Sequence, residues 1–179
     1  MKEPQRKART DWGAAIGDLF FRSSTAAKAP LPISRSSKRE AWIVASICGL
    51  IFWVLYSLTV APSLGMGHDT GELTTCCVLQ GVPHSPGYPL FVCLGWLAGQ
   101  FTSLNQAPYA NNLLAAAEVG MAMAFLGAAL TIATRPMPAL IATMLAGTCT
   151  AVWRQAVLTE VFSLHLLLLC ILIWLAILW

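Results

Sequence analysis

Four long apolar stretches follow residue 40 and set the organisation of the chain. The first, Trp42–Val60, has nineteen residues without a charged side chain, and Asn112–Thr134 is a second of full length. Ala139–Trp153 is shorter, whereas Val157–Trp179 is long and rich in leucine. A helix rises about 1.5 Å per residue, so about twenty apolar residues cross a hydrocarbon core of roughly 30 Å. The pattern therefore predicts an all-α integral membrane protein with about four transmembrane helices.

Small side chains recur at every fourth position of the second long stretch. They are Ala116, Gly120, Ala124 and Ala128. On a helix these positions form one stripe, and small residues there let another membrane helix approach closely. We expect this stripe to be a helix–helix contact.

Charge separates the chain into a tail and a membrane domain. Only 11% of the residues are charged, against about 25% in soluble proteins. Nine of the eleven Lys and Arg lie in the first forty residues, so the net charge of +3 belongs to the tail and does not indicate a nucleic-acid partner. Basic residues before a span mark the cytosolic side. We interpret residues 1–40 as a cytosolic tail, mostly disordered apart from an amphipathic stretch at Trp12–Phe21, and residues 41–179 as the transmembrane domain.

The topology depends on Tyr88–Leu104, which is apolar but has only seventeen residues. It is either a short span or a re-entrant helix. We favour the re-entrant alternative, because Arg135 then lies on the same side as the basic tail. Residues 61–111 would form a lumenal loop with short helices, and Arg154 and Glu160 would lie on the same side as Asp69.

The polar residues of this loop are concentrated in Gly65–Pro89. Asp69 and Glu72 are three residues apart, so they share one face of a helix. An ionised carboxylate there could accept the proton of an attacking hydroxyl. The same spacing is that of a capping box, in which Asp69 starts a helix over Thr70–Gln80 and Glu72 reaches back to it. The two roles are compatible, and the sequence leaves both open.

Three further positions are candidates for binding. His84 lies in the proline-rich turn His84–Pro89, where it could contact a phosphate or simply be solvated. Glu160 precedes a leucine-rich stretch, and an acid in a membrane segment is a functional candidate. Arg154 is a candidate counter-ion or phosphate contact, whereas Glu118 is a weaker functional candidate and His165 is interpreted as a packed polar residue. The sequence shows no metal-ligand cluster, P-loop or Ser/His/Asp order.

Four motifs carry a family resemblance: Gly67–Leu73, Gly81–Phe91, Asn111–Leu114 and Thr159–Leu164. In this order they resemble the transmembrane protein 260 family. Its members are multi-pass glycosyltransferases of the GT-C type that O-mannosylate IPT domains of cell-surface receptors in the endoplasmic reticulum. The likeness covers about residues 42–179, which correspond to the N-terminal part of a family member. The sequence departs from the family pattern at His68, Thr70, Ser85, Ala110 and His165.

The resemblance implies a GT-C-like helical bundle and a reaction. Mannose would pass from dolichyl phosphate mannose to a Ser or Thr hydroxyl of an acceptor protein, with Asp69 as general base and Glu72 beside it. His84, Tyr88, Arg154 and Glu160 would bind the donor and its lipid phosphate. The implied partners are the lipid bilayer, the polyprenyl-phosphate donor and the acceptor. No cofactor or bound metal is expected, and a metal requirement stays open.

Two other functions stay open. Because the apolar helix runs up to Trp179 and the likeness covers only part of the family, the chain could be a truncated or degenerate paralogue without catalysis. A polytopic transporter-like protein would also explain Glu118 and Glu160. Transporters commonly contain internal repeats, and we find no repeat in this sequence.

Overall fold

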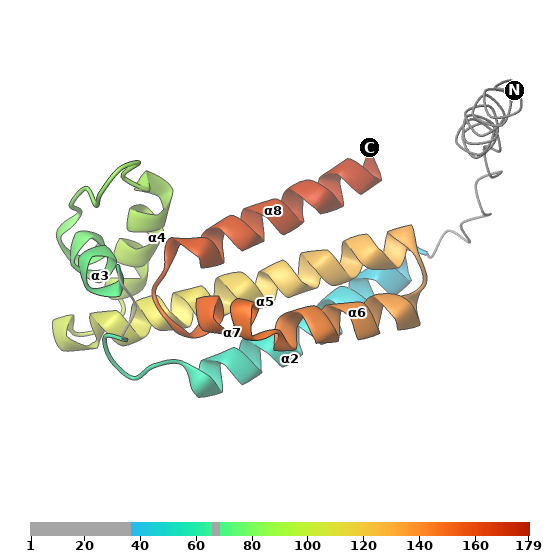
Figure 1. Cartoon of the computed structure of the whole chain (residues 1–179), viewed down its shortest axis with the longest axis horizontal. Helices are drawn as coiled ribbons and strands as arrows, with labels where there is room; N and C mark the ends of the chain where they lie inside the picture. Colours follow the sequence, from blue (N-terminus) through green and yellow to red (C-terminus); the bar gives the residue numbers. More distant parts are fainter. Residues whose placement is uncertain (1–36, 66–68) are drawn as a thin grey trace, which may run out of the picture. The chain divides into compact units, whose positions relative to one another are not determined.

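The computed structural model describes residues 37–65 and 69–179. The prediction of a disordered tail over residues 1–40 falls almost entirely outside these ranges, as does the amphipathic stretch Trp12–Phe21. The described chain is all-helical (Figure 1). Its elements are α2 (Lys38–Thr59), α3 (Thr70–Leu79), α4 (Pro89–Gly99), a 3-10 turn (Leu104–Gln106), α5 (Ala107–Ala133), α6 (Pro136–Thr148), α7 (Thr150–Val157) and α8 (Val161–Leu178).

Three helices are long and apolar enough to cross a membrane, which confirms the all-α membrane class. They are α2, α5 with the preceding 3-10 turn, and α8. The single span expected over Ala139–Trp153 is broken into two helices, α6 and α7, which meet at an angle of 64° and together are long and apolar enough for one bent span or a re-entrant loop. The break falls at Cys149, whose backbone is extended, and the preceding Thr148 hydroxyl donates to the carbonyl oxygens of Met144 and Leu145. Such back-bonding by threonine bends helices.

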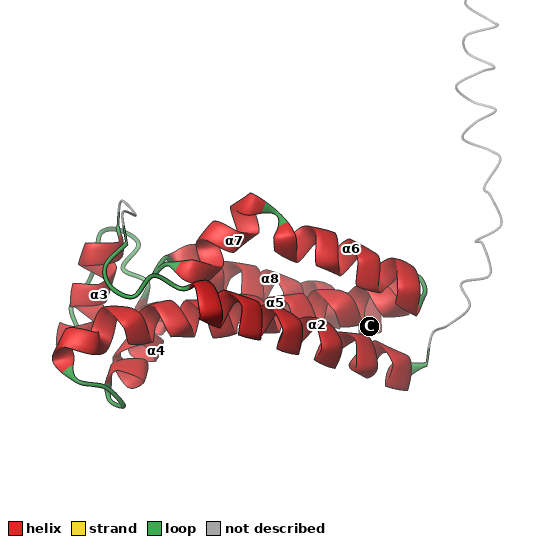
Figure 2. Ribbon diagram, turned by 90° about the horizontal axis from the view of Figure 1, so that it is seen from below, coloured by secondary structure: helices red, strands yellow, loops and turns green. Residues whose placement is uncertain are grey.

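Helix α5 is the centre of the bundle, with α2, α6, α7 and α8 packed around it (Figures 1 and 2). The predicted stripe of small residues lies on the face of α5 that packs against α2. A Cβ atom on Gly120 would stand 3.0 Å from Trp53 Cβ, and Ala124 faces Gly49. Ala128 packs with Ala41 and Ala45 near the start of α2. The stripe therefore lets α2 and α5 approach closely, as expected.

The contact between α2 and α6 is equally close. The Tyr56 hydroxyl donates to the carbonyl oxygen of Gly147 at 2.8 Å, and both groups are buried. A Cβ atom on Gly147 would lie 2.3 Å from the Phe52 ring, so a larger residue there would force the ring to shift. Phe52 and Tyr56 are stacked and belong to the largest buried apolar cluster.

The helix directions place α3 and α4 at one end of the bundle. Helix α5 is antiparallel to α2, because Ala128 near the end of α5 packs against Ala41 at the start of α2. Helix α8 is antiparallel to α2 as well, since the rings of Trp42 and Trp174 are 5.7 Å apart. Helices α3 and α4, which come between α2 and α5 in the sequence, lie at the end where α2 finishes (Figure 1). Helix α4 has 11 residues, about 17 Å, which is too short to cross. This is the arrangement expected if Tyr88–Leu104 does not span.

Candidate functional site

Asp69 stands at the N-terminus of α3, as the sequence predicts, but it does not cap the helix with its side chain. Its backbone is helical (φ −110°, ψ −5°), whereas a capping residue normally has an extended backbone that brings its oxygen over the first free N–H groups. The capping-box prediction is therefore wrong. The helix itself matches the expected Thr70–Gln80 to within one residue, and Gln80 ends it in a left-handed conformation. Both carboxylates are thereby available for other partners.

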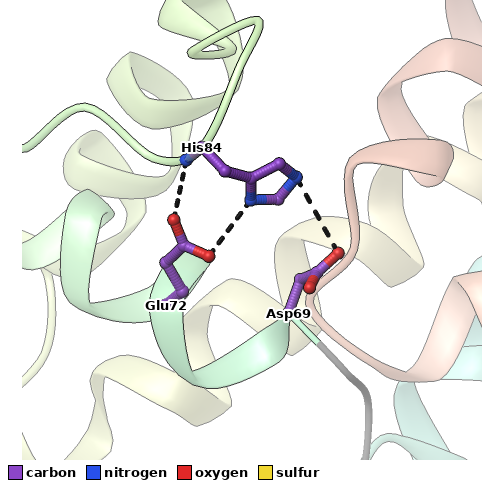
Figure 3. Close-up of side chains that lie close together, drawn as sticks. All are labelled: Asp69, Glu72 and His84. Carbon is purple, nitrogen blue, oxygen red and sulfur yellow. Dashed lines mark hydrogen bonds and ion pairs between the residues drawn. The ribbon is translucent and has the colours of Figure 1, made fainter.

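Glu72 binds His84 in place of the helix N-terminus (Figure 3). The backbone N–H of His84 donates to Glu72 Oε1 at 2.7 Å, and the ring atom Nδ1 lies 3.1 Å from Oε2. These contacts with His84, first the backbone hydrogen bond and then that of the ring, hold the pKa of Glu72 below its ordinary value. The two contacts fasten the loop after α3 to the first turn of α3.

The ring of His84 lies between two carboxylates. Its other nitrogen, Nε2, is 4.0 Å from Asp69 Oδ2 (Figure 3). The side chains of Asp69, Glu72 and His84 are each a little under half exposed. In the described part of the chain no Lys or Arg forms an ion pair with either acid. Aspartate and glutamate thus share one face of α3 as predicted, and the histidine that joins them comes from the following loop.

Tyr88 is placed by the turn that follows His84. Gly87 and Tyr88 both have positive φ, +88° and +41°, and Tyr88 directly precedes α4. The tyrosine ring meets the histidine ring edge-on, with centroids 5.6 Å apart. On its other side Tyr88 borders an apolar groove of about 290 Å³ between the start of α4 and α8. The groove is lined by Pro86, Tyr88, Pro89, Leu90, Phe91, Val161, Leu164, His165 and Leu168.

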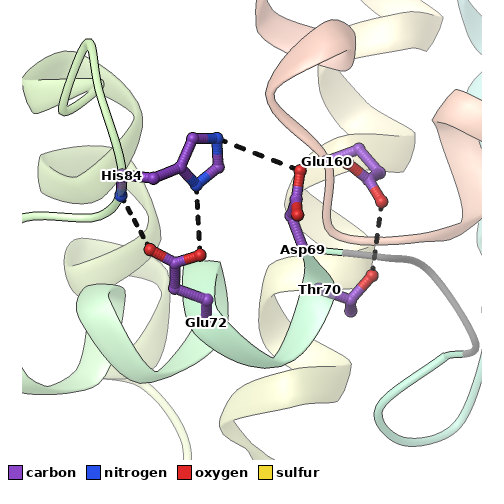
Figure 4. A network of polar contacts seen from close by, with 5 residues as sticks. All are labelled: Asp69, Thr70, Glu72, His84 and Glu160. Carbon is purple, nitrogen blue, oxygen red and sulfur yellow. Dashed lines mark hydrogen bonds and ion pairs between the residues drawn. The ribbon is translucent and has the colours of Figure 1, made fainter.

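Glu160 reaches the site from the segment directly before α8. Its backbone is extended, so it does not lie inside the long helix expected over Val157–Trp179. Its Oε1 accepts a hydrogen bond of 3.5 Å from the Thr70 hydroxyl, next to Asp69 (Figure 4). The start of α8 and the start of α3 therefore meet, ninety residues apart in the sequence. The expectation that Glu160 and Asp69 lie on the same side agrees with this contact.

Arg154 does not pair with the two acids of α3. It is exposed on α7, and within residues 37–65 and 69–179 it forms no ion pair with Asp69 or Glu72. Its role as a phosphate contact stays a prediction. Glu118 is buried in α5, where its Oε2 accepts a 2.5 Å hydrogen bond from Ser163 of α8. This bond joins two membrane-spanning helices, which gives Glu118 a structural role.

The residues that hold the site in place, Asn112 and Thr159, lie in two of the four family motifs, but no role was predicted for either. The side-chain amide of Asn112 donates to the carbonyl oxygens of Ala61 and Ser63, at 2.9 and 3.1 Å. Its oxygen accepts a 2.6 Å hydrogen bond from Thr159, and both side chains are almost fully buried. Asn112 thereby ties the chain after α2 to the residue before Glu160. An asparagine at the edge of an apolar stretch was the available signal.

The structure also assembles a set of possible metal ligands that the sequence did not reveal. One ligand atom from each of Asp69, Glu72 and His84 lies within 4.8 Å of the other two. His84 is twelve residues from Glu72, and this separation matches no short metal-binding motif. Only the fold of the loop brings the imidazole to the carboxylates.

Comparisons with known proteins agree with the motifs at this site. The family model described as Protein O-mannosyl-transferase TMEM260 N-terminal domain matches residues 69–179. The protein O-mannosyl-transferase tmem260 of Dictyostelium discoideum is 48% identical over 44 residues, which is 25% of this chain and 5% of that relative. The protein O-mannosyl-transferase TMEM260 of Mus musculus is 42% identical over 60 residues, which is 34% of this chain and 8% of the relative. No solved structure matches the chain. Because the family model covers well over half of its residues, the chain belongs to the TMEM260 N-terminal domain family.

Proposed function

We propose that this chain carries catalytic residues of a protein O-mannosyltransferase of the endoplasmic reticulum membrane. The names of the two relatives support a mannosyl transfer to protein, although the matched segments are less than a tenth of each relative. The single observation that supports the chemistry is the meeting of Asp69, Glu72, His84 and Glu160 at one end of a membrane bundle. The donor we propose is dolichyl phosphate mannose.

In the proposed reaction Asp69 is the general base. The hydroxyl oxygen of an acceptor Ser or Thr attacks the anomeric carbon of mannose, and Asp69 takes the hydroxyl proton. The bond from the anomeric carbon to the phosphate oxygen breaks, and dolichyl phosphate leaves with its electron pair. An in-line attack inverts the anomeric centre. Glu72 positions His84, whose ring faces Asp69.

The groove beside Tyr88 is the proposed place for the lipid end of the donor. Its lining is almost entirely apolar, and it begins at Tyr88 and Val161, beside His84 and Glu160. An isoprenoid chain in this groove would bring its phosphate to the polar residues. The basic tail supports the proposed orientation, in which the start of α2 faces the cytosol and the site faces the lumen.

The reaction is tested with the full-length protein and two variants of α3. Asp69→Asn keeps the shape of the side chain and removes the base, so turnover should fall by about 10²–10⁴. Thr75→Ala is the matched control on the same helix, since the Thr75 hydroxyl only donates to the carbonyl oxygen of Gly71. Transfer of radiolabelled mannose to an acceptor peptide is measured. Undiminished turnover by Asp69→Asn would exclude Asp69 as base, and no transfer by the wild type would favour the non-catalytic alternative.

The proposed orientation has its own test. Phe101→Asn creates the acceptor sequence Asn-Thr-Ser at an exposed position after α4, and the unaltered chain has no such sequence. Arg35→Asn creates Asn-Ser-Ser in the tail. In microsomes only the Phe101→Asn variant should gain a glycan, seen as a mobility shift that endoglycosidase H removes. A glycan on the tail variant would reverse the orientation.

A further inference from the structure

We propose that Asp69 and His84, supported by Glu72, bind a divalent transition-metal ion. This goes beyond the proposed transfer, because the ligands define the site whatever group is transferred. Ligand atoms of the three side chains lie within 4.8 Å of one another. The side chains are 43–46% exposed, so water or a phosphate oxygen can complete the coordination. No described Lys or Arg forms an ion pair with these acids.

The orientation of the histidine points to the ligand atoms. Glu72 carries only acceptor oxygens, so the short contact at Nδ1 is a donated N–H, which leaves the lone pair of a neutral ring on Nε2. Nε2 then faces Asp69 Oδ2 across 4.0 Å (Figure 3). Two acceptor atoms that face each other are stabilised by a cation between them. Zinc–ligand distances of about 2.0–2.2 Å in a tetrahedral site place two ligand atoms roughly 3.3–3.6 Å apart, so the two side chains would approach each other by about half an ångström when an ion binds.

The role of Glu72 follows from the same geometry. A histidine that binds a metal through one nitrogen usually donates its other N–H to a carboxylate, which fixes the tautomer and the ring orientation. Glu72 does this for His84, and it also accepts the backbone N–H of the same residue at 2.7 Å. The ring is therefore held in place before any ion binds.

The chemistry of the ligands selects the class of ion. Calcium and magnesium prefer sites made only of oxygen atoms. An imidazole with a carboxylate suits zinc, and it also suits manganese, for which carboxylate is the usual ligand. The ion would join the first turn of α3 to the loop after it, through Asp69 and His84. Bound through Oδ2, Asp69 keeps Oδ1 to accept a proton.

The experiment measures bound metal on the full-length protein without any substrate. The protein is purified in detergent, stripped with EDTA, incubated with Zn²⁺ or Mn²⁺ and passed over a desalting column, and its metal content is determined by inductively coupled plasma mass spectrometry. The wild type should retain about one ion per chain. Asp69→Asn and His84→Ala should retain almost none. Glu72→Gln should bind about 10–100-fold more weakly, as expected for a supporting residue.

His165→Ala is the matched control. This histidine lies on α8, where its Nδ1 contacts the carbonyl oxygen of Val161, and it belongs to no cluster of possible ligands in the described chain. The control variant should bind metal like the wild type. Helical content by circular dichroism identifies a variant that fails to fold, and the isosteric Asp69→Asn then decides. Absence of metal from the wild type, or full retention by folded His84→Ala or Asp69→Asn, would overturn the proposal. Mannosyl transfer is measured separately, so either proposal can fail alone.

Discussion

The hydrogen bonds of Asn112 provide the sharpest test of how the site is held in place. Asn112→Ala removes two donated bonds, to Ala61 and Ser63, and one accepted bond from Thr159. Each contributes about 0.5–1.5 kcal/mol net, so the free energy of unfolding should fall by about 1.5–4.5 kcal/mol. Thr159→Val removes only the 2.6 Å bond to Asn112, and about 1 kcal/mol is expected.

The coupling between the two residues is more informative than either single loss. Once Asn112 is alanine, Thr159 has no amide oxygen to bind, so Thr159→Val should cost less in that background than in the wild type. In a membrane protein, the coupling energies measured by double-mutant cycles for hydrogen-bonded side-chain pairs average about 0.6 kcal/mol. We take this value as the lower end of the coupling energy expected for Asn112 and Thr159. Unfolding by SDS in mixed micelles, followed by circular dichroism, gives all four free energies. Fully additive effects, or no loss of stability from Asn112→Ala, would refute the reasoning.

Two further predictions concern packing. Gly147→Ala should destabilise the protein by about 1–3 kcal/mol, because the added Cβ would lie 2.3 Å from the Phe52 ring. Phe52→Leu should relieve part of that loss in the same SDS assay. An unchanged unfolding midpoint for Gly147→Ala would contradict the close contact. In variants that keep a single cysteine, the exposed Cys93 should react with N-ethylmaleimide at pH 8. Cys77 should react far more slowly, because burial raises its pKa to about 12 and only roughly one molecule in 10⁴ then carries the thiolate. Mass spectrometry after timed labelling checks this, and equal rates would show that α3 and α4 open readily.

The burial of Cys77 bears on how firmly the site residues are placed. Its sulfur lies at the contact of α3 with α4, so close to Gly95 that a Cβ atom there would stand 2.3 Å from it. Leu73 and Cys77 of α3 also pack with Val161 and Leu164 of α8. The exposed face of α3 carries Glu72, and its buried face fixes the helix against the bundle. Asp69 and Glu72 are thus presented from a packed helix, although they lie at the surface.

The family resemblance and the tertiary structure support different parts of the functional proposal. The motifs and the family match concern residue identity, and they favour a transferase. The contacts concern position, and they show that acids from α3 and from the residue before α8 meet at one end of the bundle. The mannose-transfer assay with Asp69→Asn tests the proposed base directly.

The sequence by itself determined the membrane class, most of the helices and the shared face of Asp69 and Glu72. These features depend on the length of apolar runs and on helical spacing, which are local properties. The small-residue stripe from Ala116 to Ala128 was also readable, because its period of four is that of one helix face. The capping-box prediction was wrong because the backbone of Asp69 is helical, and the spacing of Asp69 and Glu72 does not reveal that conformation.

Only the tertiary structure decided what those side chains contact. Glu72 binds His84 because the loop after α3 folds back over its first turn, and Glu160 reaches Thr70 because α8 starts where α3 starts. The bend between α6 and α7 likewise depends on Cys149 and the threonine before it. Contacts between residues 12 to 90 positions apart are fixed by helix packing around α5. Short-range pattern carries no information about them, which is why the arrangement of the site required the fold.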